Sequence, residues 1–152
     1  MLRMAAIALF IVALARPVEQ HSESETTIEG VDIVLAMDIS GSMLAQDFKP
    51  DRLEASKSIA AEFIADREGD RISVVAFAGE AFTQCPLTSD RGAVQTSLSR
   101  LRSGVIDDGT AIGNGLATAI NRLRESSAKS KVVVLVTDGD NNSGQISPRM
   151  AA

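Results

Sequence analysis

Three oxygen-bearing side chains follow one short apolar run at alternate positions. The run is Ile33–Met37, and Asp38, Ser40 and Ser42 come directly after it. Its length and continuity favour a buried parallel strand over a helix or a half-exposed strand. A carboxylate and two hydroxyls at i, i+2 and i+4 can converge on a hard cation such as Mg²⁺, which prefers octahedral oxygen ligands. In open α/β sheets, ligand sites lie at the carboxyl ends of strands. The alternative is an ordinary turn, which uses the same residue types.

Two further positions offer oxygen ligands in the same order along the chain. Thr110 stands where a loop enters a predicted helix, and Asp138 follows the apolar run 132–136. Both also have plain structural interpretations, because a threonine can cap its helix and an aspartate before a glycine can form a turn. The neighbouring Asp107 and Asp108 are interpreted as solvated loop charges.

The pattern of apolar residues predicts the elements that position these side chains. Strands are expected over Ile33–Met37, Arg71–Phe77, Ala81–Cys85 and Lys131–Thr137, and helices over Asp51–Arg67, after the capping residues 88–90, and over Ala111–Glu125. The short turn at 78–80 can join only antiparallel neighbours, because parallel strands need a long crossover. The prediction is therefore an α/β three-layer sandwich with a mostly parallel sheet that carries one antiparallel strand.

The three helices are each expected to bury one apolar face. The residues assigned to these faces are Leu53, Ile59, Ala60, Phe63 and Ile64 in the first, Val94, Leu98 and Leu101 in the second, and Ile112, Leu116, Ile120 and Leu123 in the third. Their spacing follows the helical period, so each set can pack against the sheet.

Composition narrows the functional classes. The chain has 152 residues, which is enough for one domain, and a formal net charge of −5 with five Phe and neither Trp nor Tyr. Negative charge and missing aromatic platforms argue against a nucleic-acid partner. The single cysteine, Cys85, is expected to be buried and cannot form an intrachain disulfide. The single histidine, His21, gives no support to a histidine-based triad or a zinc site.

The N-terminal part differs from the rest of the chain. Residues 4–15 are apolar and lie between Arg3 and Arg16. A spanning helix needs about 20 apolar residues, so we interpret residues 1–17 as the remnant of a membrane anchor or a signal-like segment. Residues 18–29 are a polar, acidic linker, and 30–152 form the domain.

The string Asp38-Ile39-Ser40-Gly41-Ser42 resembles the DxSxS motif of von Willebrand factor type A domains, the metal-ion-dependent adhesion site. The resemblance implies that Thr110 and Asp138 supply the remaining ligands of a site for Mg²⁺ or Mn²⁺. It also implies a Rossmann-like fold and no enzymatic activity. The partner would be a protein whose exposed Asp or Glu completes the coordination of the ion.

A closer resemblance is to the BatA-like membrane proteins of bacterial aerotolerance operons. It rests on the strings 43–53, 84–88 and 138–142 and on Ala15-Arg16-Pro17 ahead of the domain. It implies anchoring in the bacterial inner membrane through the N-terminal segment, and of the two sides we favour the periplasmic one for the domain. It also implies action with a MoxR-type AAA+ ATPase and with sister type A proteins.

The end of the chain departs from that family. Complete domains continue for two more strands and a helix, and Ser147-Pro148 is interpreted as the beginning of that helix. An incomplete domain is therefore expected, in which the 131–137 strand becomes an apolar edge that promotes self-association.

Two interpretations from other functional classes, an enzyme and a structural module, stay open. A strand-end aspartate beside Mg²⁺ resembles the haloacid dehalogenase-like phosphatases, in which Asp38 would attack phosphorus, but Ser40 stands where that family needs a second acid. The other alternative is a metal-free structural module that assembles through its helices.

Overall fold

The computed structural model describes residues 30–139 and 141–151, so the predicted 1–17 segment and the 18–29 linker lie outside the described residues. Within these ranges the elements are β1 (Asp32–Asp38), the 3₁₀ helix η1 (Gly41–Leu44), α2 (Arg52–Ala65), β2 (Arg71–Phe77), β3 (Ala81–Thr88), α3 (Arg91–Ser99), α4 (Ile112–Arg124), β4 (Lys131–Val136) and α5 (Pro148–Ala151). No helix of the described part is long and apolar enough to cross a membrane.

The sheet has the strand order β3-β2-β1-β4. The central strand β1 pairs in parallel with β2 and with β4, and Asp38 at its carboxyl end lies opposite Phe77 of β2. The hairpin partner β3 pairs antiparallel with β2. The predicted mixed sheet with one antiparallel strand is thereby confirmed. The carboxyl end of β1 lies between those of its parallel neighbours β2 and β4.

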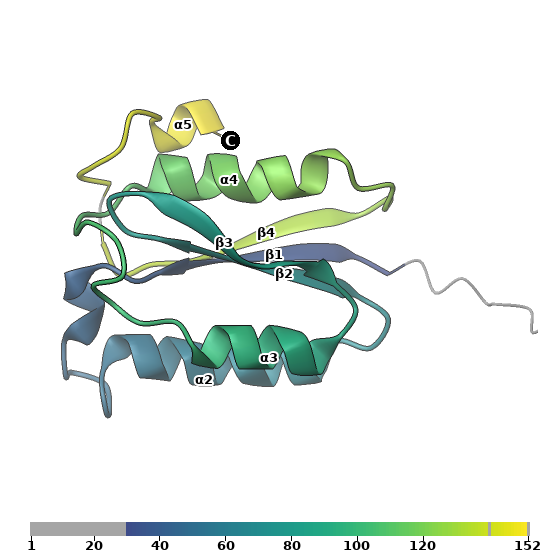
Figure 1. Ribbon diagram of the computed structural model, residues 1–152, viewed down its shortest axis with the longest axis horizontal. Coiled ribbons are helices and arrows are strands. Elements are labelled where there is room, and N and C mark those ends of the chain that lie inside the picture. Colours follow the sequence, from purple (N-terminus) through teal and green to yellow (C-terminus); the bar gives the residue numbers. More distant parts are fainter. Residues whose placement is uncertain (1–29, 140, 152) are drawn as a thin grey trace, which may run out of the picture.

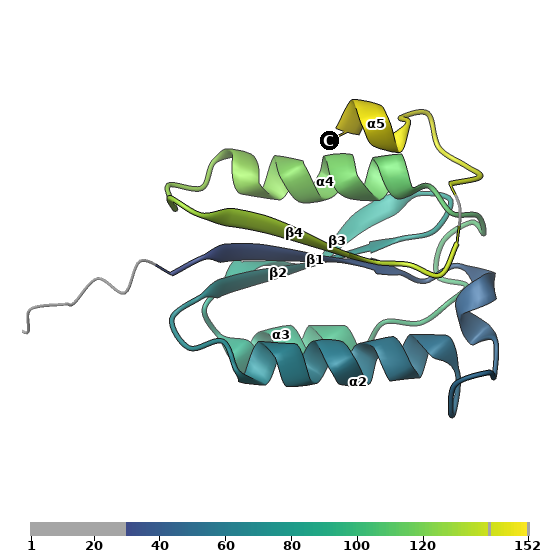
Figure 2. The same cartoon turned by 180° about the vertical axis from the view of Figure 1, so that it is seen from behind.

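Helices cover both faces of the sheet, which makes three layers (Figures 1 and 2). Helices α2 and α3 lie on one face, and α4 lies on the other with α5 outside it. Alternate residues of β1 serve the two faces because side chains in a strand point to opposite sides. Ile33, Leu35 and Met37 belong to the core on the α2 and α3 side, and Val34 and Ala36 to the core on the α4 side.

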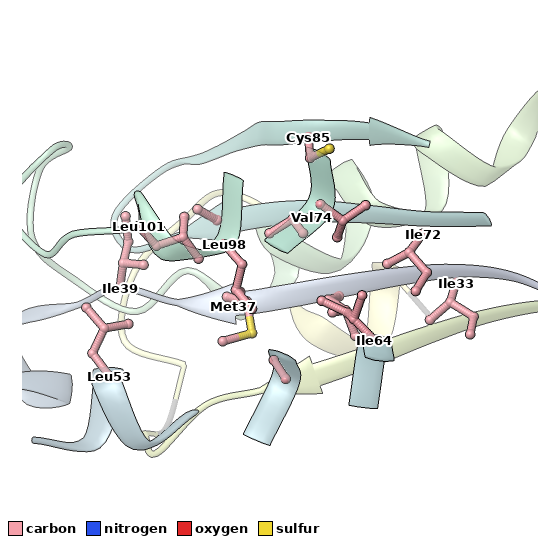
Figure 3. Close-up of a cluster of buried hydrophobic side chains, with 14 of the residues drawn as sticks. Ile33, Met37, Ile39, Leu53, Ile64, Ile72, Val74, Cys85, Leu98 and Leu101 are labelled. Atoms are coloured by element: carbon pink, nitrogen blue, oxygen red, sulfur yellow. The ribbon is translucent and has the colours of Figure 1, made fainter. Parts of the chain in front are cut away.

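The larger core lies between the sheet and the first two helices (Figure 3). Met37 and Ile64 pack in it, and Cys85 is buried there as a free thiol, as predicted. Burial of these apolar side chains contributes about 25 cal/mol per Å² of surface removed from water. The same core includes Ile39 and Met43, which come after Asp38, so buried apolar side chains support the chain on both sides of that residue.

Two helix-face assignments were wrong. The Ile59 side chain is 69% exposed and that of Ile120 is 41% exposed, although both follow the helical period. Ile59 instead lines a groove of about 160 Å³ with Phe63, Val134 and Val136, between α2 and the face of the sheet that α2 covers. Among the described strands β4 has only β1 beside it. The apolar strand β4 is therefore an edge of the described sheet, as expected. Self-association of the protein through this edge stays a prediction.

The third strand was expected to be shorter. It continues past Cys85 to Thr88 and contains Pro86. Proline lacks the backbone N–H that an inner strand needs, but β3 is at the edge of the sheet, where this is tolerated. The pairing of β3 with β2 is also irregular between Ile72 and Val75.

Candidate metal centre

Asp38 is held in one orientation at the end of β1. It is fully buried. Its Oδ1 accepts a hydrogen bond from the backbone N–H of Ser40 over 2.9 Å, and its Oδ2 accepts one from the Thr137 hydroxyl over 2.6 Å. Both oxygens of a buried carboxylate are therefore paired, which offsets part of the cost of its desolvation. Thr137 follows β4, so Asp38 links the ends of two adjacent strands.

The two serines continue from Asp38 toward the surface. Ser40 precedes η1 as its N-cap but makes no side-chain capping bond. Its hydroxyl lies 3.0 Å from that of Ser42, and the Ser42 hydroxyl donates to Asp138 Oδ1 over 3.0 Å. Ser40 is buried and Ser42 is exposed. The row of oxygen atoms thus runs from the core to the solvent.

Thr110 enters the site from the loop before α4. The loop is fixed to the β2–β3 turn, because Gly79 N–H donates to the Asp107 carbonyl over 2.9 Å and Ala111 N–H donates to the Ala78 carbonyl over 2.7 Å. Thr110 is buried, and a β-carbon placed on Gly139 would lie 3.6 Å from its Oγ1. The hydroxyl therefore faces the turn that follows β4.

Helix capping does not explain Thr110. The residue before α4 is Ala111, and no side chain makes a capping bond there. Thr110 is held by its backbone instead, because its N–H donates to Asn142 Oδ1 over 2.8 Å and its carbonyl accepts from the Asn142 N–H over 3.1 Å. This side-chain and backbone pairing leaves the Thr110 hydroxyl free to face the site.

Asp138 lies between the hydroxyl of Ser42 and the guanidinium of Arg52. Its Oδ1 accepts from Ser42 Oγ, and its Oδ2 accepts from Arg52 Nη1. The turn itself is stabilised by the preceding threonine, since Gly139 N–H donates to Thr137 Oγ1 over 3.2 Å. The turn interpretation therefore applies to Thr137, and the side chain of Asp138 points into the site.

Sequence reasoning missed three charged residues of this region. Arg52 and Asp47 form a pair next to Asp138. Asp108, interpreted above as a solvated loop charge, is exposed but accepts hydrogen bonds from the backbone N–H groups of Gly41 and Gly109 over 2.8 and 2.9 Å. Asp108 is thus an exposed loop charge, as interpreted, but its carboxylate also fixes the loop before Thr110 to the serine-bearing turn.

Those hydrogen bonds predict a pH effect. The backbone N–H groups of Gly41 and Gly109 hold the pKa of Asp108 below its usual value, so its contacts add stability above the unfolded pKa and lose it as pH falls. Asp108→Ala should lower the melting temperature at about pH 6, with the difference shrinking below about pH 4. Melting curves of both proteins across this range are the measurement, with Asp107→Ala as control. A difference that is constant with pH would contradict the role of the Asp108 carboxylate.

The set of donors suits a hard divalent cation. The structure brings Asp38, Ser40, Ser42 and Asp138 into one chain of contacts and places Thr110 beside it. All donors are oxygens, which fits Mg²⁺ or Mn²⁺. Across the described ranges no group of three or more His, Cys, Asp or Glu side chains could hold a metal. The candidate site instead combines two carboxylates, Asp38 and Asp138, with the hydroxyls of Ser40, Ser42 and Thr110.

Comparisons with known proteins give the same fold. The family model described as the von Willebrand factor type A domain matches residues 33–141. An uncharacterized protein of Borreliella burgdorferi is 37% identical over 142 residues, which cover 93% of this chain and 42% of that protein.

Two solved structures are similar to this chain with TM-scores of 0.72. They are an aerotolerance-related membrane protein from Bacteroides fragilis, 38% identical, and the conserved hypothetical protein BatB from Bacteroides thetaiotaomicron, 36% identical. Each match covers 76% of this chain and 57% of the solved chain. The chain thus spans less than two thirds of the proteins it matches.

Proposed function

Because this chain belongs to the von Willebrand factor type A domain family, we propose that it is a protein-interaction module that depends on Mg²⁺ or Mn²⁺. The observation that carries the proposal is the chain of contacts from Asp38 through Ser40 and Ser42 to Asp138. It joins carboxylates and hydroxyls from the ends of β1 and β4, at the edge where open α/β sheets bind ligands.

The five residues have different roles in this proposal. Ser40, Ser42 and Thr110 offer neutral oxygen ligands, and Asp38 and Asp138 supply negative charge. When bound, the ion would act as a Lewis acid, and a carboxylate of the partner would complete its coordination shell. Ser42 is exposed whereas Asp38 and Ser40 are buried, so the solvent side is where a partner would approach.

The partner is proposed to be a protein with an exposed Asp or Glu. Candidates are a MoxR-type AAA+ ATPase and sister type A proteins, and the place of action is the bacterial inner membrane. The support for the membrane is that one similar structure is described as an aerotolerance-related membrane protein.

A binding role fits Asp38 better than a catalytic one. A phosphatase of the haloacid dehalogenase type needs a carboxylate free to attack and a second acid two residues later. Asp38 is fully buried with both oxygens in hydrogen bonds, and Ser40 occupies the second position. The proposal therefore assigns no catalytic residue.

Thr110→Val tests the site with little change in shape. Divalent ion at about 100 times its Kd should stabilise the wild-type protein by about 2.7 kcal/mol, and the variant should lose most of this gain because it lacks the hydroxyl. Thermal melting with Mg²⁺ and with EDTA is the measurement. Thr96→Val, on an exposed part of α3, is the matched control. If Mg²⁺ stabilises neither the wild-type protein nor the control, the proposed metal dependence is wrong.

A further inference from the structure

Arg52 carries its positive charge to the candidate metal centre from the start of α2. Asp51 caps this helix by accepting a hydrogen bond from the Glu54 N–H over 2.8 Å, and Arg52 N–H donates to the Ala45 carbonyl over 3.1 Å. These contacts fix the backbone of Arg52. Its Nη1 donates to Oδ2 of Asp138, which is the oxygen not used by Ser42. The Arg52 guanidinium is thus already bonded to one carboxylate oxygen of Asp138, which is a proposed metal ligand.

Asp47 holds the other side of the same guanidinium. Arg52 Nε donates to Asp47 Oδ1 over 2.8 Å, and Nη2 donates to Oδ2 over 2.8 Å. Such two-point pairing is the strongest geometry between arginine and a carboxylate. The Asp47 and Asp138 carboxylates together raise the pKa of Arg52, so its charge is constant. The guanidinium is shared between one carboxylate of the site and one outside it.

This sharing affects how well the site attracts a divalent ion. A positive charge bonded to Asp138 weakens the attraction of that carboxylate for a second cation. Asp47 partly offsets this effect, because it neutralises Arg52 from the opposite side. The affinity for the ion should therefore depend on both residues, with opposite signs.

The arginine also has room to move. Its side chain is 32% exposed and that of Asp138 is 14% exposed. Asp47, Arg52 and Asp138 line one cavity of about 330 Å³ together with Phe48. Arg52 can withdraw toward Asp47 and solvent without disturbing the buried core.

We propose that Arg52 is a resident counter-cation of the metal centre, which competes with the divalent ion for Asp138 and is restrained by Asp47. This inference rests on the proposed metal-dependent function and adds a residue that sets the affinity of the site. The metal-free state keeps Asp138 paired with Arg52, and the ion-bound state releases Arg52 to Asp47. A guanidinium that only positioned Asp138 would instead strengthen the binding of the ion.

Isothermal titration with MnCl₂ distinguishes these two roles. Arg52→Gln should bind Mn²⁺ about tenfold more tightly than the wild-type protein, because an uncharged donor replaces the cation. Arg52→Lys should stay close to wild-type affinity although it loses the two-point geometry. Asp47→Asn should bind several-fold more weakly. The control is Arg91→Gln, whose guanidinium pairs with Glu68.

The outcomes separate this inference from the function on which it rests. Weaker or unchanged binding by Arg52→Gln, with normal wild-type binding, overturns the counter-cation and leaves the metal centre intact. If Arg52→Gln binds Mn²⁺ and the wild-type protein does not, Arg52 excludes the ion from Asp138 completely, which supports the inference. Absence of binding in all variants overturns both. Melting curves in EDTA establish that each variant is folded before it is titrated.

Discussion

Asp38→Ala is expected to weaken Mg²⁺ or Mn²⁺ binding at least about 100-fold, which corresponds to about 2.7 kcal/mol. The substitution removes one of the two carboxylates of the site. It also leaves the Ser40 N–H and the Thr137 hydroxyl without their acceptor, so the two strand ends lose their link. Isothermal titration of the wild-type and variant proteins measures the effect.

Asp38→Asn separates charge from shape in the same experiment. The amide keeps an oxygen that can accept from the Ser40 N–H, so the turn should persist while the negative charge is lost. We expect it to bind the ion nearly as poorly as Asp38→Ala. Glu125→Gln at the distant end of α4 is the control for a general loss of acidic charge. Wild-type affinity in both Asp38 variants would contradict the assignment of this carboxylate.

Binding of a protein partner is expected to disappear when the divalent ion is removed. The partner's carboxylate would meet Asp38 and Asp138 without an intervening cation, and like charges at short distance repel. With a purified MoxR-type ATPase as the partner, we expect at least about a 100-fold loss of affinity in EDTA. Biolayer interferometry in Mg²⁺ and in EDTA measures it.

Two controls make that result specific. Restoring excess Mg²⁺ after EDTA should restore binding, and changing the partner's contact Asp or Glu to its amide should remove it. If the ATPase binds equally well in EDTA, the interaction does not use the metal centre, even if the ion itself binds the chain.

The secondary structure around the site was predictable because the strands are strongly apolar. The predicted Arg71–Phe77 strand agrees with β2, and the predicted 131–137 strand differs from β4 only at its last residue. Continuous valine and isoleucine runs have few alternatives to a buried strand. The antiparallel pairing of β3 with β2 then follows from the short connection between them, because a parallel pair needs a long crossover.

The exposure of Ile59 and Ile120 could not be derived from the same pattern. Periodicity tells which residues share a helix face, but not how far the neighbouring layer extends over that face. Ile59 lines a groove with Val134 and Val136 of β4, the strand at which the described sheet ends. A helix wider than its support leaves apolar residues uncovered.

The charged residues around the site were missed for a different reason. Arg52 is 86 positions from Asp138, and Asp108 is 67 positions from Gly41. Local spacing carries no information on such contacts, which only the packing of loops against strand ends creates. The DxSxS spacing was visible because its three residues follow one strand.

The most direct measurement of the central claim is a Mn²⁺ titration of the ¹⁵N-labelled wild-type protein followed by NMR. Mn²⁺ broadens the signals of nearby amides, so it locates the ion without any substitution. Amides of Ser40, Ser42, Thr110 and Gly139 should broaden first and recover when excess Mg²⁺ competes. Signals at the far ends of the strands, such as Arg71 and Lys131, should stay sharp. Broadening centred on another surface, or none at stoichiometric Mn²⁺, would contradict a metal centre at the ends of β1 and β4.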